Sequence, residues 1–415
     1  MNKIILATLI TISLNAANLK DIISSTQKQN GYIKAKEYEL LAKQKDISAI
    51  KKSYLPTADI FANFTYNSPK TLTTPGRVTN LGIMLNAKLY DGGKRANQIR
   101  AKRLENRAKS FEIKALQRSL SLKAINLYYN YFKAIANKRA LIARKKALLG
   151  QISRVKKLIN ANLATNVELD RLKAALAQNA YAVSSVDLAI KSAKENLQVL
   201  SHKKFKSLRY NHFLEPKHIA FSPNEDILKI RANAKALIFS KNAVNSITKP
   251  QVALSYTYSK NKFGNTLDSP FGSLPEHTSK LNLKASLRVF DGGSTNQRAE
   301  SIKYQRLALL SKANELTREQ KRDFKLAKLK LNSIKQSIKS AREALNASNS
   351  TYKNIKEQYE AGLVDYITYL DALTQKTVAK AQYKEALYDY EVAKAYVYYY
   401  AGKNLKGYIR WKNYF

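Results

Sequence analysis

The sequence predicts a mainly α-helical protein that also contains a few β-strands and is built from two structural repeats. Three observations support this fold class. Long stretches lack proline and glycine and carry apolar residues at coiled-coil spacing, shorter stretches alternate apolar and polar residues, and both patterns recur in the same order. The 415 residues are 45% hydrophobic, so the chain can bury a substantial core and is not expected to be disordered.

The N-terminus has the composition of an export signal. Lys3 precedes an apolar run, Ile4 to Leu14, and the small residues Asn-Ala-Ala follow at 15–17. The run is shorter than the roughly 20 residues that a membrane-spanning helix needs. We therefore predict a cleaved signal peptide at residues 1–16 and an exported mature chain; the alternative is an apolar helix packed in a cytosolic core.

The rest of the chain contains an internal repeat with an offset of 200 residues. Tyr-Asp-Gly-Gly at 90–93 recurs as Phe-Asp-Gly-Gly at 290–293. Asn-Leu at 162–163 likewise corresponds to Gly-Leu at 362–363. The repeats divide the chain into a signal peptide at 1–16, a first repeat at 17–200, a link at 201–223, a second repeat at 224–402 and a C-terminal tail at 403–415.

Two strands are predicted in each repeat, just before the Asp-Gly-Gly motif. Apolar and polar residues alternate there with the period of two that is typical of a sheet with one apolar face. The predicted strands lie at about 57–67, 79–90, 251–259 and 280–290. Each is about ten residues long, which lets a tilted strand cross a bilayer.

These strands can be interpreted in two ways. A soluble sheet half-covered by helices would show the same alternation. The export signal, and the lack of an obvious partner for the apolar faces, favour strands that cross a membrane. Single-chain bacterial barrels start at about eight strands, and an open edge in lipid leaves backbone groups unpaired, so several copies would share one barrel.

Long helices are predicted at about 94–200 and 294–402, because proline does not occur in these tracts. Each tract carries an apolar seam with alternating spacings of three and four residues. Arg118 interrupts the first seam and Gln320 interrupts the second. The seams consist of Leu104, Ala108, Phe111, Ala115, Leu122, Ile125, Tyr129, Phe132 and Ala136, and of Ala313, Leu316, Phe324, Ala327, Leu331, Ile334, Ile338, Ala341 and Leu345.

The two Asp-Gly-Gly motifs are predicted to be strand-to-helix turns. The aspartate can accept hydrogen bonds from the first N–H groups of the following helix, and the glycines tolerate the backbone angles of a sharp corner. A phosphate-binding loop is the rival interpretation, but neither glycine-rich phosphate motif occurs. The residues concerned are Asp91, Gly92 and Gly93 in the first repeat and Asp291, Gly292 and Gly293 in the second.

Basic residues greatly outnumber acidic ones, 73 to 30, for a formal net charge of +43. Such a charge suggests a polyanionic partner, either nucleic acid or an anionic membrane surface. Lys88, Lys284 and Arg288 fall on the polar faces of the predicted strands. If these faces line a barrel, its lumen is basic and favours anionic cargo.

Enzyme chemistry has no support in the sequence. The absence of cysteine excludes disulfides, thiolate zinc sites and cysteine nucleophiles. No carboxylate pair or Ser-His-Asp arrangement stands out. We therefore expect no catalytic residue, no cofactor and no metal site. The four histidines, His202, His212, His218 and His277, lie in link or loop regions without metal-ligand spacing.

These signals together resemble the TolC-like outer-membrane efflux proteins. The resemblance rests on a proline before each two-strand hairpin, the two Asp-Gly-Gly motifs, the long helices, and Tyr-Glu-Ala-Gly-Leu at 359–363 followed by Tyr-Leu-Asp-Ala at 369–372. It implies a homotrimer whose twelve strands form one barrel in outer-membrane lipid, continued by an α-helical tunnel in the periplasm. It also implies two partners, a periplasmic adaptor protein and an inner-membrane pump or ABC exporter.

By the same resemblance, the turns at 160–170 and 359–372 form the periplasmic tip, where the channel closes. Asp371 stands at a position that contributes to an acidic ring at the aperture, and Thr368 stands where members can carry a second aspartate. Tyr359 retains a tyrosine of the polar network at the tip, while Val364 replaces its arginine. Glu168 occupies an aspartate position in the first repeat.

The function predicted from the sequence is a passive outer-membrane exit duct of a tripartite efflux or type I secretion system. Two alternatives belong to other classes. One is a basic coiled-coil protein that binds nucleic acid through helix faces rich in lysine and arginine. The other is a periplasmic coiled-coil scaffold without a pore. The export signal and the amphipathic strands argue against nucleic acid as a partner.

Overall fold

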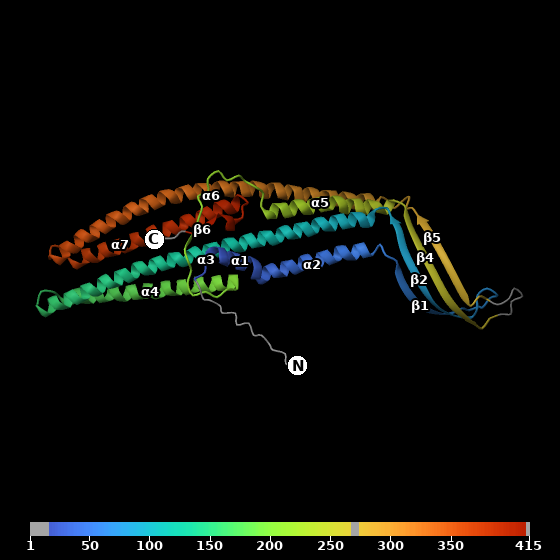
Figure 1. Ribbon diagram of the computed structural model, residues 1–415, viewed down its shortest axis with the longest axis horizontal. Coiled ribbons are helices and arrows are strands. Elements are labelled where there is room, and N and C mark those ends of the chain that lie inside the picture. The colour runs from blue at the N-terminus through green and yellow to red at the C-terminus, as the bar shows by residue number, and fades with distance from the viewer. Residues whose placement is uncertain (1–15, 267–273, 412–415) are drawn as a thin grey trace, which may run out of the picture. The chain divides into compact units, whose positions relative to one another are not determined.

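The computed structural model describes residues 16–266 and 274–411 (Figure 1). Apart from Ala16, the predicted signal peptide lies outside the described residues, as do the last residues of the predicted tail. The chain divides into two compact units. Unit 1 consists of Met1–Ala35, Ile113–Glu225 and Leu316–Phe415, and unit 2 of Lys36–Glu112 and Asp226–Glu315.

The helices are long where proline is absent. They are α1 Leu19–Gln29, α2 Gly31–Lys52, α3 Lys94–Asn160, α4 Asn166–Ser201, α5 Glu225–Asn245, α6 Ser294–Glu360 and α7 Tyr366–Tyr400, with short 3₁₀ helices η1 Ser246–Thr248 and η2 Leu405–Tyr408. Both α3 and α6 have 67 residues, about 100 Å at about 1.5 Å per residue. Within the described ranges, no helix is both long and apolar enough to cross a membrane.

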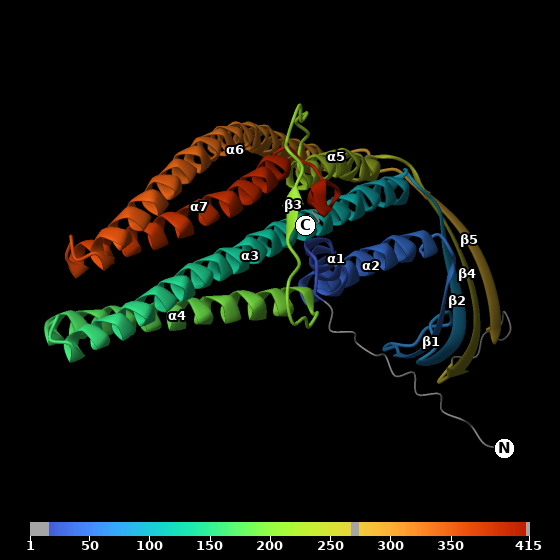
Figure 2. The same cartoon turned by 60° about the vertical axis from the view of Figure 1, so that its left-hand side comes forward.

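Four strands of unit 2 form one antiparallel sheet in the order β1-β2-β4-β5, seen side by side in Figure 2. They are β1 Thr57–Tyr66, β2 Arg77–Asp91, β4 Gln251–Gly264 and β5 His277–Ser286. The two hairpins, β1–β2 and β4–β5, meet at the long β2–β4 ladder, which runs from Arg77 opposite Gly264 to Asp91 opposite Gln251.

The second hairpin differs from its predicted bounds. β4 continues beyond residue 259 because β2 offers it a partner as far as Arg77. β5 stops at Ser286, which lies opposite Gln251, the first residue of β4. The residue before Gln251 is Pro250, which has no N–H to donate, so the chain beyond Ser286 has no ladder to join. Arg288 therefore lies after the strand rather than on its polar face.

Both Asp-Gly-Gly motifs form a tight corner between a strand and a long helix. The Asp91 carboxylate accepts hydrogen bonds from the N–H groups of Gly93 at 3.1 Å and Arg95 at 3.0 Å. Gly92 and Gly93 have φ values of 66° and 83°, which residues with a side chain rarely adopt. The second corner repeats this geometry, with Asp291 accepting from Gly293 and Thr295 at 3.0 Å each.

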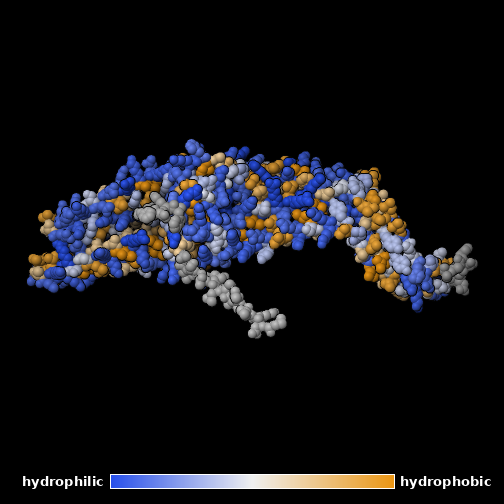
Figure 3. Space-filling view, viewed as in Figure 1, coloured by the Kyte–Doolittle hydropathy of each residue, from blue (hydrophilic) through white to orange (hydrophobic). Residues whose placement is uncertain are grey.

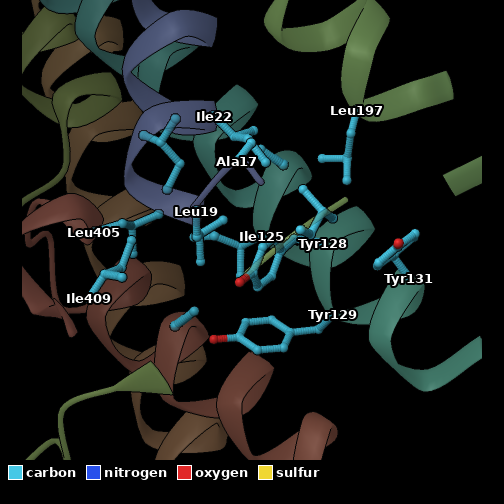
Figure 4. Close-up of a cluster of buried hydrophobic side chains, with 14 of the residues drawn as sticks. Ala17, Leu19, Ile22, Ile125, Tyr128, Tyr129, Tyr131, Leu197, Leu405 and Ile409 are labelled. Carbon is cyan, nitrogen blue, oxygen red and sulfur yellow. The ribbon is translucent and has the colours of Figure 1, made fainter. Parts of the chain in front are cut away.

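The main core of unit 1 lies where α1, α3, α4, α7 and the link converge (Figure 4). Leu19, Ile22 and Ile125 are fully buried there, next to the rings of Tyr128 and Tyr129. Both tyrosine hydroxyls find acceptors in the link. Tyr129 donates to the carbonyl of Asn211 at 2.9 Å, and Tyr128 donates to the carbonyl of Arg209. A buried phenol needs such a partner, so these bonds fix the path of the link.

The predicted link and tail pair with each other, which the sequence did not indicate. β3 Asn211–Phe213 in the link forms a two-stranded antiparallel sheet with β6 Ile409–Trp411 in the tail. The Phe213 N–H donates to Glu391 at 2.6 Å, and the Lys394 ammonium donates to the Phe213 carbonyl at 2.7 Å. Glu391 and Lys394 also pair with each other at 2.7 Å. Burial raises the pKa of the Glu391 carboxyl, and Lys394 opposes this rise.

The two polar interruptions of the helical seams are buried and bonded. The Arg118 guanidinium donates to the Tyr399 carbonyl at 2.6 Å and pairs with Glu225 at 2.8 Å. Gln320 donates to the carbonyls of Tyr400 and Ser222, at 2.8 and 3.0 Å. In each long helix, therefore, one polar residue replaces an apolar residue of the seam. Arg118 donates to a carbonyl near the end of α7, and Gln320 donates to carbonyls near the end of α7 and in the link.

We expect Glu391→Ala to lower the free energy of unfolding by about 3–5 kcal/mol, because it leaves the Lys394 ammonium buried without a carboxylate. Thermal unfolding followed by circular dichroism measures the change. Glu385→Ala is the matched control, since Glu385 is a carboxylate of α7 with a 61% exposed side chain, and we expect a loss below about 1 kcal/mol. Equal losses in the two variants would contradict a stabilising role for the buried pair.

Candidate functional site

One candidate site is the apolar face of the four-stranded sheet, which no other described part of unit 2 covers. The register places Ile60, Ile83 and Tyr258 opposite one another on this face. Ile60 is 79% exposed and Ile83 is 48% exposed. Aliphatic rows that remain exposed along a sheet mark a surface built to meet another apolar phase or protein. This apolar face consists of Ala58, Ile60, Ala62, Phe64, Leu81, Ile83, Leu85, Leu254, Tyr256, Tyr258, Leu281 and Leu283.

The opposite, polar face carries amides, hydroxyls and lysines. Asn80 donates to Asn261 across the β2–β4 ladder at 2.8 Å. Lys88 and Lys284 both lie opposite Ala253, from β2 and β5, so the two predicted lumen lysines belong to one row. The polar face consists of Asp59, Asn63, Asn80, Asn86, Lys88, Ser255, Thr257, Ser259, Asn261, Lys280, Asn282 and Lys284.

Both edges of the sheet are open. β1 pairs only with β2, and β5 pairs only with β4, among the described residues. An open edge presents a row of unpaired N–H and C=O groups that can pair with a strand of another chain.

The second candidate site is the end of the helices in unit 1, where α3 turns into α4 and α6 turns into α7. The two turns are alike: Asn162 and Gly362 have φ values of 58° and 77°, and the following Leu163 and Leu363 are 74% and 76% exposed. Apolar side chains of all four helices pack beneath these turns. This tip cluster consists of Leu148, Val155, Leu169, Leu172, Tyr359, Tyr369 and Leu373.

Glu168 and Tyr359, both predicted from the resemblance, meet at the tip. The Tyr359 hydroxyl donates to the Glu168 carboxylate, and its ring stacks on Tyr369 with centroids 5.0 Å apart. Burial and the neighbouring Glu168 carboxylate raise the pKa of Tyr359. The Arg154 guanidinium lies 5.2 Å from the centre of the Tyr359 ring and donates to the Glu360 carbonyl at 2.6 Å. The resemblance implies an arginine at position 364, where this chain has valine. Arg154 of α3 nevertheless places a guanidinium next to Tyr359.

Asp371 and Thr368 lie outside this group. Asp371 is exposed on α7 and accepts a hydrogen bond from Gln375 at 2.6 Å. Thr368 is exposed too, but its N–H and hydroxyl both donate to Asp365, the N-cap of α7, at 2.8 and 2.7 Å. These bonds hold the pKa of Asp365 below its usual range. Thr368 therefore stabilises the start of the helix.

Two tip residues were missed from the sequence. Asp365 could have been found, because an aspartate directly after a turn and before a helical pattern is a common N-cap. Arg154 had no signal, since basic residues occur throughout α3. Thr165 and Glu168 have the spacing of a capping box, yet Thr165 makes no side-chain cap and Glu168 bonds to Tyr359 instead.

No metal centre competes with these two sites in the part of the chain that the structure describes. No group of three or more histidine, aspartate or glutamate side chains there has the geometry to hold an ion. His277 contacts Tyr258, with 3.1 Å between Nδ1 and the hydroxyl.

Long helical hairpins and a small sheet with an uncovered apolar face also make up the fold of several solved outer-membrane proteins. The chain matches VceC, an outer membrane protein of Vibrio cholerae, with a TM-score of 0.78 and 15% identity over 93% of this chain and 96% of that one. It matches the CmeC outer membrane channel of Campylobacter jejuni with a TM-score of 0.78 and 17% identity over 92% of this chain and 85% of that one. It matches the MtrE outer membrane channel of Neisseria gonorrhoeae with a TM-score of 0.75 and 14% identity over 93% of this chain and 89% of that one.

The sequence itself carries the family pattern in its second half. Residues 219–403 match the model of the outer membrane efflux protein family. No curated protein sequence matches the chain. The resemblance to TolC-like outer-membrane efflux proteins, predicted from the motifs, is confirmed: residues 219–403 match that family's model, and over 90% of the chain has the fold of the solved outer-membrane proteins.

We expect Tyr359→Phe to loosen the tip, because it removes a hydrogen bond to a charged group worth about 1.5–3 kcal/mol. Hydrogen exchange at the turn amides of Ala361, Gly362 and Leu363, all bonded to carbonyls of α6, should report a lower opening free energy. Tyr181→Phe, on α4 with Tyr181 80% exposed, is the matched control and should leave exchange unchanged. Unaltered protection in Tyr359→Phe would show that the bond does not hold the tip.

Proposed function

We propose that this protein is the outer-membrane exit duct of a tripartite efflux or type I secretion system. Three copies contribute four strands each to a twelve-stranded barrel, and their helices form a tunnel in the periplasm. An inner-membrane pump or ABC exporter drives the cargo, and a periplasmic adaptor connects the two. The proposal includes removal of residues 1–16 during export and a chain organised as the two repeats predicted above.

The observation that carries this proposal is the uncovered apolar face with open strand edges on both sides. In water the face would expose aliphatic rows, whereas in a bilayer it meets acyl chains of the same polarity. Lipid requires every backbone group to be bonded, so the edges of β1 and β5 must pair with other copies. Pairing β5 of one copy with β1 of the next closes a ring and leaves no edge.

The helical tips support an adaptor as the partner. Leu163 and Leu363 are exposed apolar side chains at the turns of the two helical hairpins. Neither turn carries a charged residue at 161–164 or at 361–364. Two exposed leucines of this kind can pack against an apolar surface of complementary shape on an adaptor. The tip cluster and the Tyr359–Glu168 bond hold both turns in place beneath them.

We propose that Asp371 lines the aperture and that the basic polar face lines the lumen. Asp371 is exposed and unpaired with any cation in the described chain, so three copies around an axis would form an acidic ring. Thr368 is uncharged and donates its hydroxyl hydrogen bond to Asp365, so it adds no charge to this ring. Lys88 and Lys284 lie on the lumen side of the sheet and would favour anionic cargo over cationic cargo.

Insertion into the membrane tests the proposed function. We expect the wild-type chain, expressed in a Gram-negative host, to be recovered as a carbonate-resistant outer-membrane trimer. Ile83→Lys places a charge on the apolar face at a central strand, which costs about 2–4 kcal/mol at the bilayer midplane, and should reduce the recovered trimer sharply. Asn86→Lys, on the same strand but on the polar face, is the matched control and should be tolerated.

Either of two results would contradict the exit duct. Wild-type protein in the soluble periplasmic fraction would indicate the scaffold without a pore. Equal insertion of Ile83→Lys and Asn86→Lys would show that the apolar face does not meet lipid.

We expect Asp371→Asn to weaken the block of single channels by multivalent cations, because it removes one carboxylate from each copy at the aperture. Planar-bilayer recordings with a trivalent cation on the tunnel side measure the blocking concentration. Asp170→Asn is the matched control, since Asp170 is an exposed carboxylate near the other tip that pairs with Lys173. If both variants are blocked like the wild type, Asp371 has no part in the aperture.

A further inference from the structure

The apolar face of the sheet ends in a group of basic side chains beside the loops. Lys260 lies opposite Leu81 on β2 and opposite His277 on β5. Lys262 lies opposite Thr79, and Arg77 lies opposite Gly264 one rung farther along. Residues directly opposite, or two apart on one strand, share a face of the sheet. Arg77, Lys260, Lys262 and His277 therefore form one patch, here called the outer basic cluster, that continues the apolar face.

The outer basic cluster is exposed and lacks acidic partners within the sheet. None of its four side chains takes part in an ion pair with another described residue, and the apolar face contains no aspartate or glutamate. Neighbours on one strand are about 7 Å apart and diagonal neighbours across a ladder about 7–8 Å apart. Arg77, Lys260 and Lys262 carry positive charges, and cations held this close repel one another unless an anion lies between them.

The side chains leading to the cluster change in a regular order. Along the face of β4 that bears the cluster they are Val252, Leu254, Tyr256, Tyr258, Lys260 and Lys262, which is two aliphatic residues, two tyrosines and two lysines. On the side that Figure 3 shows, hydrophobic residues cover the helix end of the sheet and hydrophilic residues lie next to the loops. Acyl chain, interface and headgroup follow one another in the same order across one leaflet of a bilayer.

We propose that the outer basic cluster binds the phosphate groups of an anionic lipid in the leaflet next to the loops. This inference rests on the proposed function, which sets the sheet in the outer membrane with its apolar face toward lipid. The lysine stems lie along the apolar face while their ammonium groups reach the headgroups, as long basic side chains do at interfaces. The lipid's acyl chains pack against Tyr256 and the aliphatic rows below.

A lipid fits this patch better than a free anion does. A soluble phosphate would use the cations alone, whereas a phosphorylated lipid also covers the tyrosines and the exposed aliphatic rows next to them. The basic residues of the polar face cannot serve the same ligand, because Lys280 and Lys284 lie on the other side of the sheet.

The binding of phosphorylated lipid A to the purified trimer tests the proposal. Native mass spectrometry compares lipid A with its dephosphorylated form, and we expect the wild type to bind the phosphorylated form about tenfold more tightly or better. The variant K260Q/K262Q should lose this preference. The matched control K280Q/K284Q removes the same charge from the polar face and should retain it.

Each other outcome has a distinct meaning. A wild-type chain that forms no membrane trimer overturns the proposed function and this inference together. A trimer that forms but binds both forms of lipid A equally, or retains its preference in K260Q/K262Q, overturns this inference alone. Displacement of the lipid by millimolar inorganic phosphate would indicate a free-anion site instead. The wild-type comparison decides the matter even if K260Q/K262Q fails to assemble.

Discussion

The buried pair of Glu391 and Lys394 is the interaction on which the organisation of unit 1 depends. The link between the repeats has little regular structure, yet its backbone crosses a packed core, where unbonded N–H and C=O groups are costly. The pair satisfies both backbone groups of Phe213, and Tyr128 and Tyr129 satisfy the neighbouring carbonyls of Arg209 and Asn211. A charge pair is costly to bury, but here each charge also bonds to the backbone, so neither is left uncompensated. The β3–β6 pairing and the packing of α1, α3 and α7 around it follow from this fixed path.

The same requirement explains which parts of the fold the sequence could predict. Periodicity indicated the long helices and the strands because these elements satisfy their own backbone groups and need only an apolar face. β3 and β6 are three residues each and almost 200 residues apart, so no period or local motif reveals them. Arg118 and Gln320 interrupt the apolar seams, yet each donates a hydrogen bond from a long helix to a carbonyl at the C-terminal end of α7. At the tip, the resemblance supplied Glu168 and Tyr359, whereas Arg154 depends on which helix face meets the tyrosine, and only the packed structure specifies that.

The lysines of this strongly basic chain lie in several different surroundings, and the neighbouring side chains determine what each lysine can bind. Lys394 is buried, and its charge is fully bonded by Glu391 and the Phe213 carbonyl. Lys88 and Lys284 lie among amides and hydroxyls on the polar face of the sheet. Lys260 and Lys262 end a series of aliphatic and aromatic side chains on the other face. The net charge therefore gives little information about function. The group that a lysine can bind depends on whether carboxylates, amides or apolar side chains surround it.

The lengths of the strands suit the ring of strands proposed above. The inner strands β2 and β4 have 15 and 14 residues and pair with each other. The edge strands β1 and β5 have ten residues each. If β5 of one copy pairs with β1 of the next, the two open edges have equal length and every N–H and C=O group within them can find a partner. Short edge strands also limit unwanted pairing before assembly, since less backbone is open to another chain. Each chain therefore has one long internal ladder and two edges of equal length, and in the proposed barrel such a sheet satisfies its backbone by pairing with other copies.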